Sequence, residues 1–100
     1  MCGIFGKVYG TSNSDYNKDK FYKALNLLEH RGPDNFGAIF KPEFSFGHRR
    51  LSIIDLSENA NQPFTSNDGL VTIVFNGEIY NFNELKDNLT HKYIFKTESD

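Results

Sequence analysis

The second residue of the chain is a cysteine, and it is the only cysteine among the 100 residues. Removal of Met1 would leave a free α-amine on the same residue as the Cys2 thiol. An α-amine titrates at about 7.7–8.0 and a thiol at about 8.5, so the amine can accept the thiol proton close to neutral pH. This arrangement predicts a nucleophile for acyl transfer that carries its own base. The alternative is that Cys2 is a small hydrophobic residue at the start of a strand.

Asn76 and Gly77 form a second candidate for chemistry. An Asn-Gly pair between two apolar stretches is a strong signal for a tight hairpin turn, since both residues tolerate positive φ. The asparagine amide and the next main-chain N–H can also form an oxyanion hole, which stabilises the charge that develops when a carbonyl is attacked. The two interpretations do not exclude each other.

Two adjacent arginines, Arg49 and Arg50, follow His48. Neighbouring residues of an extended chain point to opposite faces, so at most one of the two guanidinium groups can enter a given site. A guanidinium fork suits a carboxylate, such as that of an amino acid. The alternative is that both arginines lie on a solvated edge of a sheet.

Acidic residues stand near the ends of the expected strands. Glu78, Glu98 and Asp100 could neutralise the ammonium group of an amino acid, or they could belong to the ordinary surface. The histidines lack the spacing of metal ligands and are interpreted as structural, so no metal site is expected; they are His30, His48 and His91.

The composition excludes several classes of partner. Eleven Lys and Arg against thirteen Asp and Glu give a net charge of −2, which provides no broad positive field for a nucleic acid or an anionic membrane. No apolar run approaches the roughly 20 residues of a membrane-spanning helix, and the N-terminus lacks a leader pattern. A lone cysteine cannot form an intramolecular disulfide, which favours a reducing compartment. We therefore expect a cytoplasmic protein with neither nucleic-acid nor membrane partners.

The pattern of apolar residues predicts strands mixed with only two helices, which is an α+β fold. One helix is expected from about Tyr16 to near Gly32, after polar residues at 11–15. Asn81 and Glu84 resemble a helix cap, and they predict a second helix that ends near residue 89. Short apolar or aromatic stretches predict strands at 3–9, 36–40, 44–46, 51–54, 70–75 and 93–95.

Six stretches of the chain occur in the order and spacing of one known family. They are Met1-Cys-Gly-Ile-Phe-Gly6, His30-Arg-Gly-Pro-Asp34, Gly47-His-Arg-Arg-Leu-Ser-Ile-Ile-Asp55, Gln62-Pro63, Phe75-Asn-Gly-Glu-Ile-Tyr-Asn81 and Glu98-Ser-Asp100. Over its whole length the chain resembles the class II, N-terminal-nucleophile type of glutamine amidotransferase domain, and among its members the glutamine-hydrolysing asparagine synthetases.

The resemblance implies a four-layer α/β/β/α sandwich, of which residues 1–100 are the N-terminal portion. The domain would be incomplete at its C-terminus, since the chain stops at Asp100 directly after a strand signal. A C-terminal synthetase domain would lie outside the chain. The resemblance implies no cofactor in residues 1–100, and ATP with Mg for that further domain.

The resemblance also implies roles for individual residues. Cys2 would be the nucleophile, and Asn76 with Gly77 would form the oxyanion hole. Arg50 would bind the α-carboxylate of glutamine. The remaining substrate-binding positions would be four residues of the pocket wall and two acids around the substrate ammonium, namely Leu51, Ser52, Ile53, Ile54, Glu78 and Asp100. No role is implied for residues 30–34 beyond support of the site.

The implied reaction is the hydrolysis of glutamine to glutamate and ammonia through a thioester on Cys2. The ammonia would serve the ATP-dependent amidation of aspartate in the synthetase domain, and a homodimer is compatible with this activity. Two alternatives stay open. One is an amidotransferase for a sugar or phosphoribosyl acceptor, and the other is a truncated, noncatalytic module.

Overall fold

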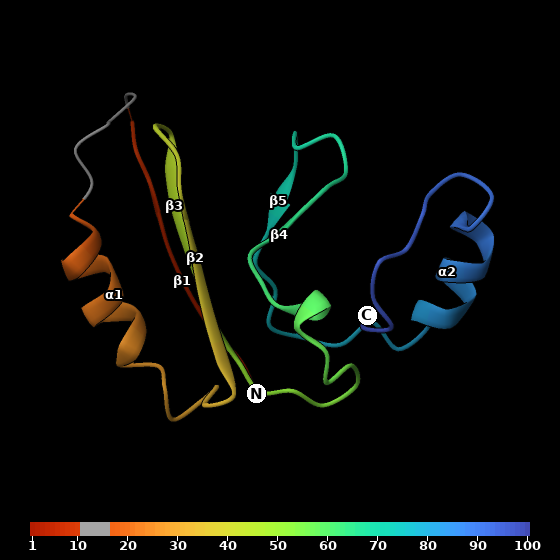
Figure 1. Cartoon of the computed structure of the whole chain (residues 1–100), viewed down its shortest axis with the longest axis horizontal. Coiled ribbons are helices and arrows are strands. Elements are labelled where there is room, and N and C mark those ends of the chain that lie inside the picture. The colour runs from red at the N-terminus through yellow and green to blue at the C-terminus, as the bar shows by residue number, and fades with distance from the viewer. Residues whose placement is uncertain (11–16) are drawn as a thin grey trace.

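The computed structural model describes residues 1–10 and 17–100, and it has the mixed α+β character that the sequence predicts (Figure 1). The predicted polar segment 11–15 and the predicted helix start at Tyr16 lie outside the described residues. Along the chain the elements are β1 (Gly3–Val8), α1 (Lys18–Asn26), β2 (Asn35–Phe40), β3 (Phe44–Arg50), the short 3-10 helix η1 (Glu58–Ala60), β4 (Phe64–Thr65), β5 (Thr72–Ile73) and α2 (Phe82–Leu89).

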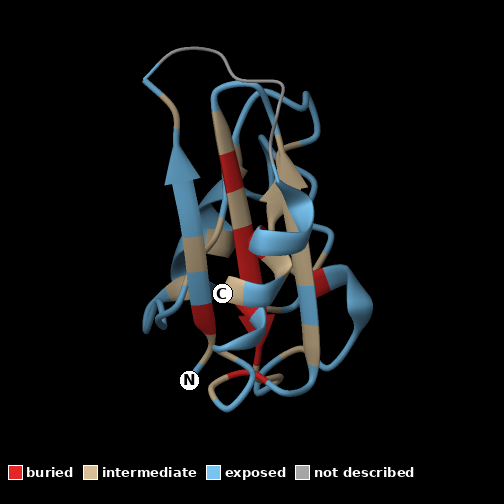
Figure 2. Ribbon diagram, turned by 90° about the vertical axis from the view of Figure 1, so that its left-hand side faces the viewer, coloured by how far each residue is buried: buried red, intermediate tan, exposed pale blue. Residues whose placement is uncertain are grey.

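The larger sheet is antiparallel and three-stranded, in the order β1-β3-β2. Strand β3 lies in the centre, with Arg49 paired to Gly3 of β1 and to Phe36 of β2. Because β3 has a partner on each side, most of its second half is buried (Figure 2). The three predicted strands are confirmed, and β3 extends to Arg50 rather than ending at residue 46.

Helix α1 covers one face of this sheet through Phe21 and Leu25, which are both buried. The Phe21 ring lies 4.8 Å from the Phe5 ring of β1 and 5.1 Å from the Phe40 ring of β2. Such aromatic contacts stabilise the helix on the sheet beyond the burial of area alone. The Asn17 side chain accepts a hydrogen bond from the main-chain N–H of Lys20, which satisfies one of the free donors at the helix start.

The smaller sheet pairs β4 with β5 through only two residues each. The predicted strand at 70–75 is therefore wrong in length. The tight turn between these strands contains Gly69, whose φ of 75° is one that glycine adopts without strain. Asp68 accepts hydrogen bonds from the Ser66 hydroxyl and the Leu70 N–H, so the hairpin forms at Asp68-Gly69 rather than at Asn76-Gly77.

Two other predicted strands do not form. Residues 51–54 are a loop, because the main-chain N–H groups of Leu51 and Ser52 bond to side chains and not to a neighbouring strand. Residues 93–95 are also irregular, and the Tyr93 N–H bonds back to the carbonyl of Leu89 at the end of α2. Helix α2 itself is confirmed, but the Asn81 side chain makes no capping hydrogen bond, so the predicted cap is wrong.

Along the long axis of the molecule, the elements lie in the order α1, the larger sheet, the smaller sheet and α2 (Figure 1). A complete sandwich of two stacked sheets is not formed among the described residues, because the second sheet has only two very short strands. The two sheet regions are nevertheless joined by a hydrogen bond of 3.1 Å between His48 Nε2 and the Phe75 carbonyl. No helix in the described part of the chain is long and apolar enough to cross a membrane.

Candidate active site

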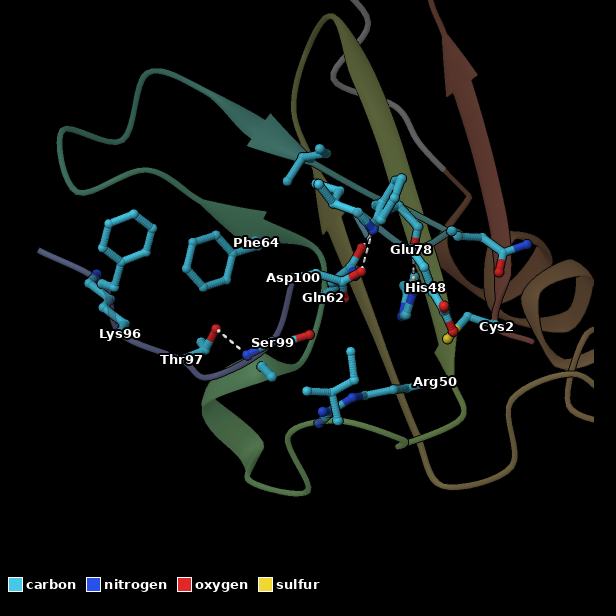
Figure 3. Close-up of a pocket in the computed structure, with 18 of the residues that line it drawn as sticks. Cys2, His48, Arg50, Gln62, Phe64, Glu78, Lys96, Thr97, Ser99 and Asp100 are labelled. Atoms are coloured by element: carbon cyan, nitrogen blue, oxygen red, sulfur yellow. Dashed lines mark hydrogen bonds between the residues drawn. The ribbon is translucent and has the colours of Figure 1, made fainter. Parts of the chain in front are cut away.

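A cavity of about 810 Å³ lies between the end of β3, the loops on either side of the smaller sheet and the C-terminal segment (Figure 3). It brings together nearly all the residues that the sequence singled out. Those that line it are Cys2, Arg50, Leu51, Ile53, Ile54, Asn76, Gly77, Glu78 and Asp100. They come from segments spread over the whole chain, so the fold assembles this cavity from distant parts of the sequence.

Ser52 is the exception among the predicted substrate-binding residues. It lines a separate, smaller cavity of about 240 Å³, and its N–H donates to a carboxylate oxygen of Asp34 at 2.7 Å. Leu51, Ile53 and Ile54 line the main cavity, whereas Ser52 does not. The predicted substrate-binding role of Ser52 stays a prediction.

Cys2 lies at one end of the larger sheet, one residue before β1 begins, and it is half-buried. Its Sγ accepts a hydrogen bond from the Leu51 N–H at 3.4 Å and lies 3.7 Å from the Leu51 carbonyl. Its own carbonyl accepts a hydrogen bond of 3.2 Å from Arg31 Nε. The segment 30–34 thus supports Cys2 directly, a contact that its position in the sequence does not reveal.

Alternation along β3 separates the two arginines, as expected. Arg50 lines the cavity, whereas the Arg49 guanidinium pairs with Glu29, in the turns after α1, at 3.1 Å and lies over the Phe36 ring of β2. Arg49 is only 4% exposed and Arg50 only 7%. The alternative of two solvated arginines is therefore wrong for both.

The Arg50 guanidinium is held by the loop that follows β3. Its Nη1 donates to the Ser57 carbonyl at 2.7 Å and to Asn61 Oδ1 at 2.8 Å, and its Nη2 donates to the Asp55 carbonyl. A guanidinium carries more N–H donors than these three acceptors use. Donors therefore remain for a carboxylate that enters the cavity.

His48 lies on the cavity face of β3, two residues before Arg50, and is 1% exposed. Burial lowers the pKa of His48 below its ordinary value, the Arg50 charge lowers it further, and the hydrogen bond to the Phe75 carbonyl opposes both effects. A neutral imidazole follows, with Nε2–H donating to Phe75. Nδ1 then has no hydrogen-bond partner in the described part of the chain.

Both main-chain groups of Phe75 are engaged. His48 binds its carbonyl, and Gln62 Oε1 accepts from its N–H at 2.6 Å. Phe75 directly precedes Asn76 and Gly77, so these contacts hold the segment that presents the two candidate oxyanion donors. Sequence analysis missed this use of His48 and Gln62, and the only signal for Gln62 was the short Gln62-Pro63 stretch.

The three acidic candidates have different surroundings. Glu78 and Asp100 line the cavity, and one Asp100 carboxylate oxygen accepts a hydrogen bond of 2.6 Å from the Ile79 N–H. The Glu98 side chain instead pairs with Lys86 of α2 at 2.9 Å. Among the described residues, no group of three or more His, Cys, Asp or Glu side chains is arranged to hold a metal ion.

Comparison with protein families gives the class of the protein. The family model of the glutamine amidotransferase domain matches residues 1–100, which is the whole chain. The chain belongs to this family, as a class II glutamine amidotransferase domain.

Individual proteins with similar sequences include asparagine synthetases and an amidase. The chain is 43% identical over 105 residues to asparagine synthetase [glutamine-hydrolyzing] 1 of Bacillus subtilis, covering all of this chain and 16% of that protein. It is 47% identical over 102 residues to asparagine synthetase [glutamine-hydrolyzing] 2 of the same organism, again over the whole chain and 13% of the relative. Amidase chyE of Penicillium rubens is 43% identical over 112 residues, with all of this chain and 16% of that protein covered. The chain thus spans less than a fifth of the length of these relatives.

Proposed function

We propose that this chain is the glutamine-hydrolysing part of a glutamine-dependent synthetase of the asparagine synthetase kind. The observation that carries the proposal is that Cys2, the Asn76-Gly77 segment, Arg50 and the two acids Glu78 and Asp100 line one cavity. A glutamine site needs a separate protein group for the side-chain amide, the α-carboxylate and the ammonium of the substrate. A nucleophile and an oxyanion hole suit its side-chain amide, an arginine suits its α-carboxylate, and acids suit its ammonium.

In the proposed reaction, Cys2 Sγ attacks the side-chain amide carbon of glutamine while the α-amine of Cys2 takes the thiol proton. The carbonyl oxygen becomes an oxyanion, which the Asn76 amide and the Gly77 N–H stabilise. Neither of these groups has a hydrogen-bond partner elsewhere in the described part of the chain, which supports their assignment. The α-ammonium then protonates the leaving nitrogen, the C–N bond breaks, and ammonia departs from a thioester.

Water completes the cycle. It attacks the thioester carbon and gives a proton to the α-amine, the C–S bond breaks, and glutamate leaves as the thiol is restored. This scheme requires removal of Met1, because an amide nitrogen on Cys2 is not basic. The intact mass of the mature protein from its own host tests that requirement directly.

The substrate would be held by its charged ends. Arg50 would bind the α-carboxylate with the guanidinium donors that its loop leaves unused, while Glu78 and Asp100 would face the ammonium. The apolar side chains of Leu51, Ile53 and Ile54 would line the wall beside the carbon chain of the substrate. Such a division into charged ends and an apolar wall suits an amino acid of intermediate length.

The ammonia acceptor would be aspartate, amidated in an ATP-dependent reaction in a further part of the protein. ATP with Mg would be used by that further part, and the sequence of residues 1–100 has no phosphate-binding loop of the Ser-Gly-Gly-x-Asp-Ser type. No step above involves these groups. In the complete protein we also propose that the layers seen in Figure 1 become the four-layer sandwich of N-terminal-nucleophile hydrolases, in a cytoplasmic enzyme.

The proposal is tested by Cys2→Ala in the complete protein. Glutamine hydrolysis and glutamine-dependent synthesis should be abolished, while synthesis from added ammonia should continue, because that chemistry does not use the thiol. Cys2→Ser is a matched variant that keeps the shape and a weaker nucleophile, and it should retain the ammonia-dependent activity in full. Equal loss of both activities in Cys2→Ala would contradict a catalytic role.

A second acceptor class has specific support. The identity to amidase chyE equals the identity to asparagine synthetase 1, at 43% over the whole chain in each case. We therefore propose, as the second candidate, the same glutamine site with a carboxylic acid other than aspartate as acceptor. Product analysis of the complete enzyme with ATP, glutamine and aspartate, compared with a set of other carboxylic acids, distinguishes the two candidates.

A further inference from the structure

We propose that Asp55 is a positioning residue that links Arg50 to Asp100. It would fix the distance between the two side chains that bind the α-carboxylate and the ammonium of one amino acid. The inference rests on the proposed function and adds a residue to which no role has been assigned so far. Asp55 does not line the cavity. It would act through the two segments that it joins.

The first link runs from Asp55 to Arg50. The Asp55 carbonyl accepts a hydrogen bond from Arg50 Nη2, and one Asp55 carboxylate oxygen, Oδ1, accepts from the Ser57 N–H at 2.8 Å. This second bond closes a local turn. The same turn presents the Ser57 carbonyl to Arg50 Nη1 at 2.7 Å. The Asp55 carboxylate therefore shapes the loop that holds the guanidinium.

The second link runs from Asp55 to the C-terminal segment. The other carboxylate oxygen, Oδ2, accepts from the Glu98 N–H at 2.9 Å, across 43 positions of sequence. Two residues later, Asp100 lines the cavity and binds the Ile79 N–H. Figure 3 shows Arg50 and Asp100 entering the same pocket from these two different segments. One carboxylate oxygen of Asp55 thus binds the loop that holds Arg50, and the other binds the segment that carries Asp100.

The chemistry of this position favours an ionised carboxylate over an amide. Hydrogen bonds from Ser57, then that from Glu98, lower the pKa of Asp55 to about 2, and the Arg50 charge acts in the same direction. A carboxylate accepts with both oxygens, whereas an asparagine that keeps the turn to the Ser57 N–H through its Oδ1 directs its NH₂ group at the Glu98 N–H. Asp55→Asn therefore breaks one link while changing the side-chain volume very little.

The test compares glutamine with 4-carbamoylbutanoate, which is glutamine without its α-amine, as substrates of the complete protein. The wild-type protein should prefer glutamine because only glutamine engages Asp100. In Asp55→Asn, the ratio of the two kcat/KM values should fall about tenfold, the scale of one hydrogen bond to a charged group. The loss should appear mainly in KM for glutamine, with kcat/KM for the analogue little changed.

Asp68→Asn is the matched control. Asp68 also accepts two hydrogen bonds within a loop, from Ser66 and Leu70, and it does not line the cavity. Its replacement should leave the ratio unchanged. If Asp55→Asn does not accumulate as folded protein, Asp55→Ser keeps one acceptor near the Ser57 N–H but cannot reach Glu98, and the same fall in the ratio is expected.

Three results would overturn the inference. An unchanged ratio would show that Asp55 does not control recognition of the ammonium, and an equal loss for both substrates would show a purely structural role. Failure of the wild-type protein to hydrolyse glutamine at all would contradict the proposed function itself, and the positioning role would fall with it. The wild-type measurement therefore separates the two failures.

Discussion

At the scale of single residues, the cavity depends on which side of β3 each side chain occupies. The register of β3 places His48 and Arg50 on the cavity face and Arg49 on the face of α1. Two adjacent and chemically identical side chains thereby acquire different tasks. Arg50 is the arginine proposed to bind the substrate, whereas Arg49 joins the turns after α1 to the sheet.

Replacement of the two arginines in the complete protein should therefore have different effects, on glutamine kinetics for Arg50 and on stability for Arg49. Arg50→Ala should lower kcat/KM for glutamine by about 30-fold to several-thousand-fold, the scale of a truncated, desolvated charge pair. Arg50→Lys should recover only part, because lysine lacks the planar fork. Arg49→Ala should instead lower the free energy of unfolding by roughly 0.5–3 kcal/mol, since its side chain is buried against Glu29 and Phe36.

Steady-state glutamine kinetics and urea unfolding of the three variants check this separation. A larger kinetic defect in Arg49→Ala than in Arg50→Ala would contradict the assignment of Arg50 to the substrate. Because Arg49 is buried, its replacement should not be silent for stability.

His48 predicts a dependence of stability on pH. Its pKa in the folded protein lies below the ordinary value of 6.5, so the unfolded chain binds a proton that the folded chain does not. The free energy of unfolding should therefore fall as the pH drops below about 6.5, with a slope of at most about 1.4 kcal/mol per pH unit, until the lowered pKa is reached.

Urea unfolding followed by circular dichroism at a series of pH values measures this slope. His48→Gln keeps an N–H donor for the Phe75 carbonyl and should flatten the pH dependence in this range. His91→Gln, at an exposed position, is the control and should preserve it. Identical pH profiles for wild type and His48→Gln would show that His48 is not the group responsible.

At the scale of elements, the end of β3 is the point where the site is assembled. The chain leaves α1 through successive turns, reaches Gly32 and pairs the Asp34 N–H with the Arg50 carbonyl at 3.0 Å. These turns bring Arg31 to the Cys2 carbonyl. The segment before β2 therefore connects Arg50, the last residue of β3, to Cys2.

Gly32 should be intolerant of substitution for this reason. A Cβ atom at Gly32 would lie 2.3 Å from the carbonyl carbon and oxygen of Arg49, which are main-chain atoms of the central strand. The strand cannot move away without loss of its pairing on both sides. Gly32→Ala should destabilise the protein by about 1–3 kcal/mol and lower glutaminase activity through displacement of Arg31.

Gly10→Ala provides the comparison, because a Cβ at Gly10 meets no atom within 4 Å. Thermal unfolding and glutamine kinetics of both variants decide the matter. Equal stability of the two alanine variants would mean that the contact between residues 30–34 and β3 is looser than the structure indicates.

At the scale of the whole molecule, the core is concentrated at one end. The apolar residues buried in the described part of the chain are Phe21, Leu25 and Ala60. The radius of gyration is 14.6 Å, against about 13 Å for a compact domain of 100 residues. Many large apolar side chains around the cavity and the smaller sheet are exposed, including Ile53, Ile54, Leu70, Val71, Ile73, Ile79, Tyr80, Ile94 and Phe95.

The 100-residue chain by itself should therefore show little or no glutaminase activity, although the candidate catalytic groups are present. Catalytic groups need support to within about 0.5 Å, and the apolar surface favours self-association over a rigid cavity. Glutamine turnover by the isolated chain, with light scattering as a measure of association, tests this. Turnover as fast as that of the complete protein, from a monodisperse isolated chain, would contradict it.

Features that depend on local order along the chain could be predicted without a structure. Apolar residues at helical spacing predicted α1, although it ends at Asn26 rather than near Gly32, and short apolar stretches predicted β1 and β2. The Asn81 and Glu84 pattern predicted α2. The position of Cys2 directly after Met1 predicts a nucleophile, and that role stays a prediction. Six motifs in order were enough for the family, because motif spacing is a property of the chain and needs no coordinates.

The ends of the strands and the partners of the polar side chains could not be predicted from the sequence, because they depend on contacts between distant segments. Whether residues 51–54 or 70–75 form strands depends on a partner strand within hydrogen-bonding distance, and here Cys2 and Asp34 take the N–H groups of Leu51 and Ser52 instead. The burial of Arg49 and the link between Asp55 and Glu98 likewise join residues distant in sequence. Such contacts arise from the approach of segments in space, which local propensity and periodicity do not encode.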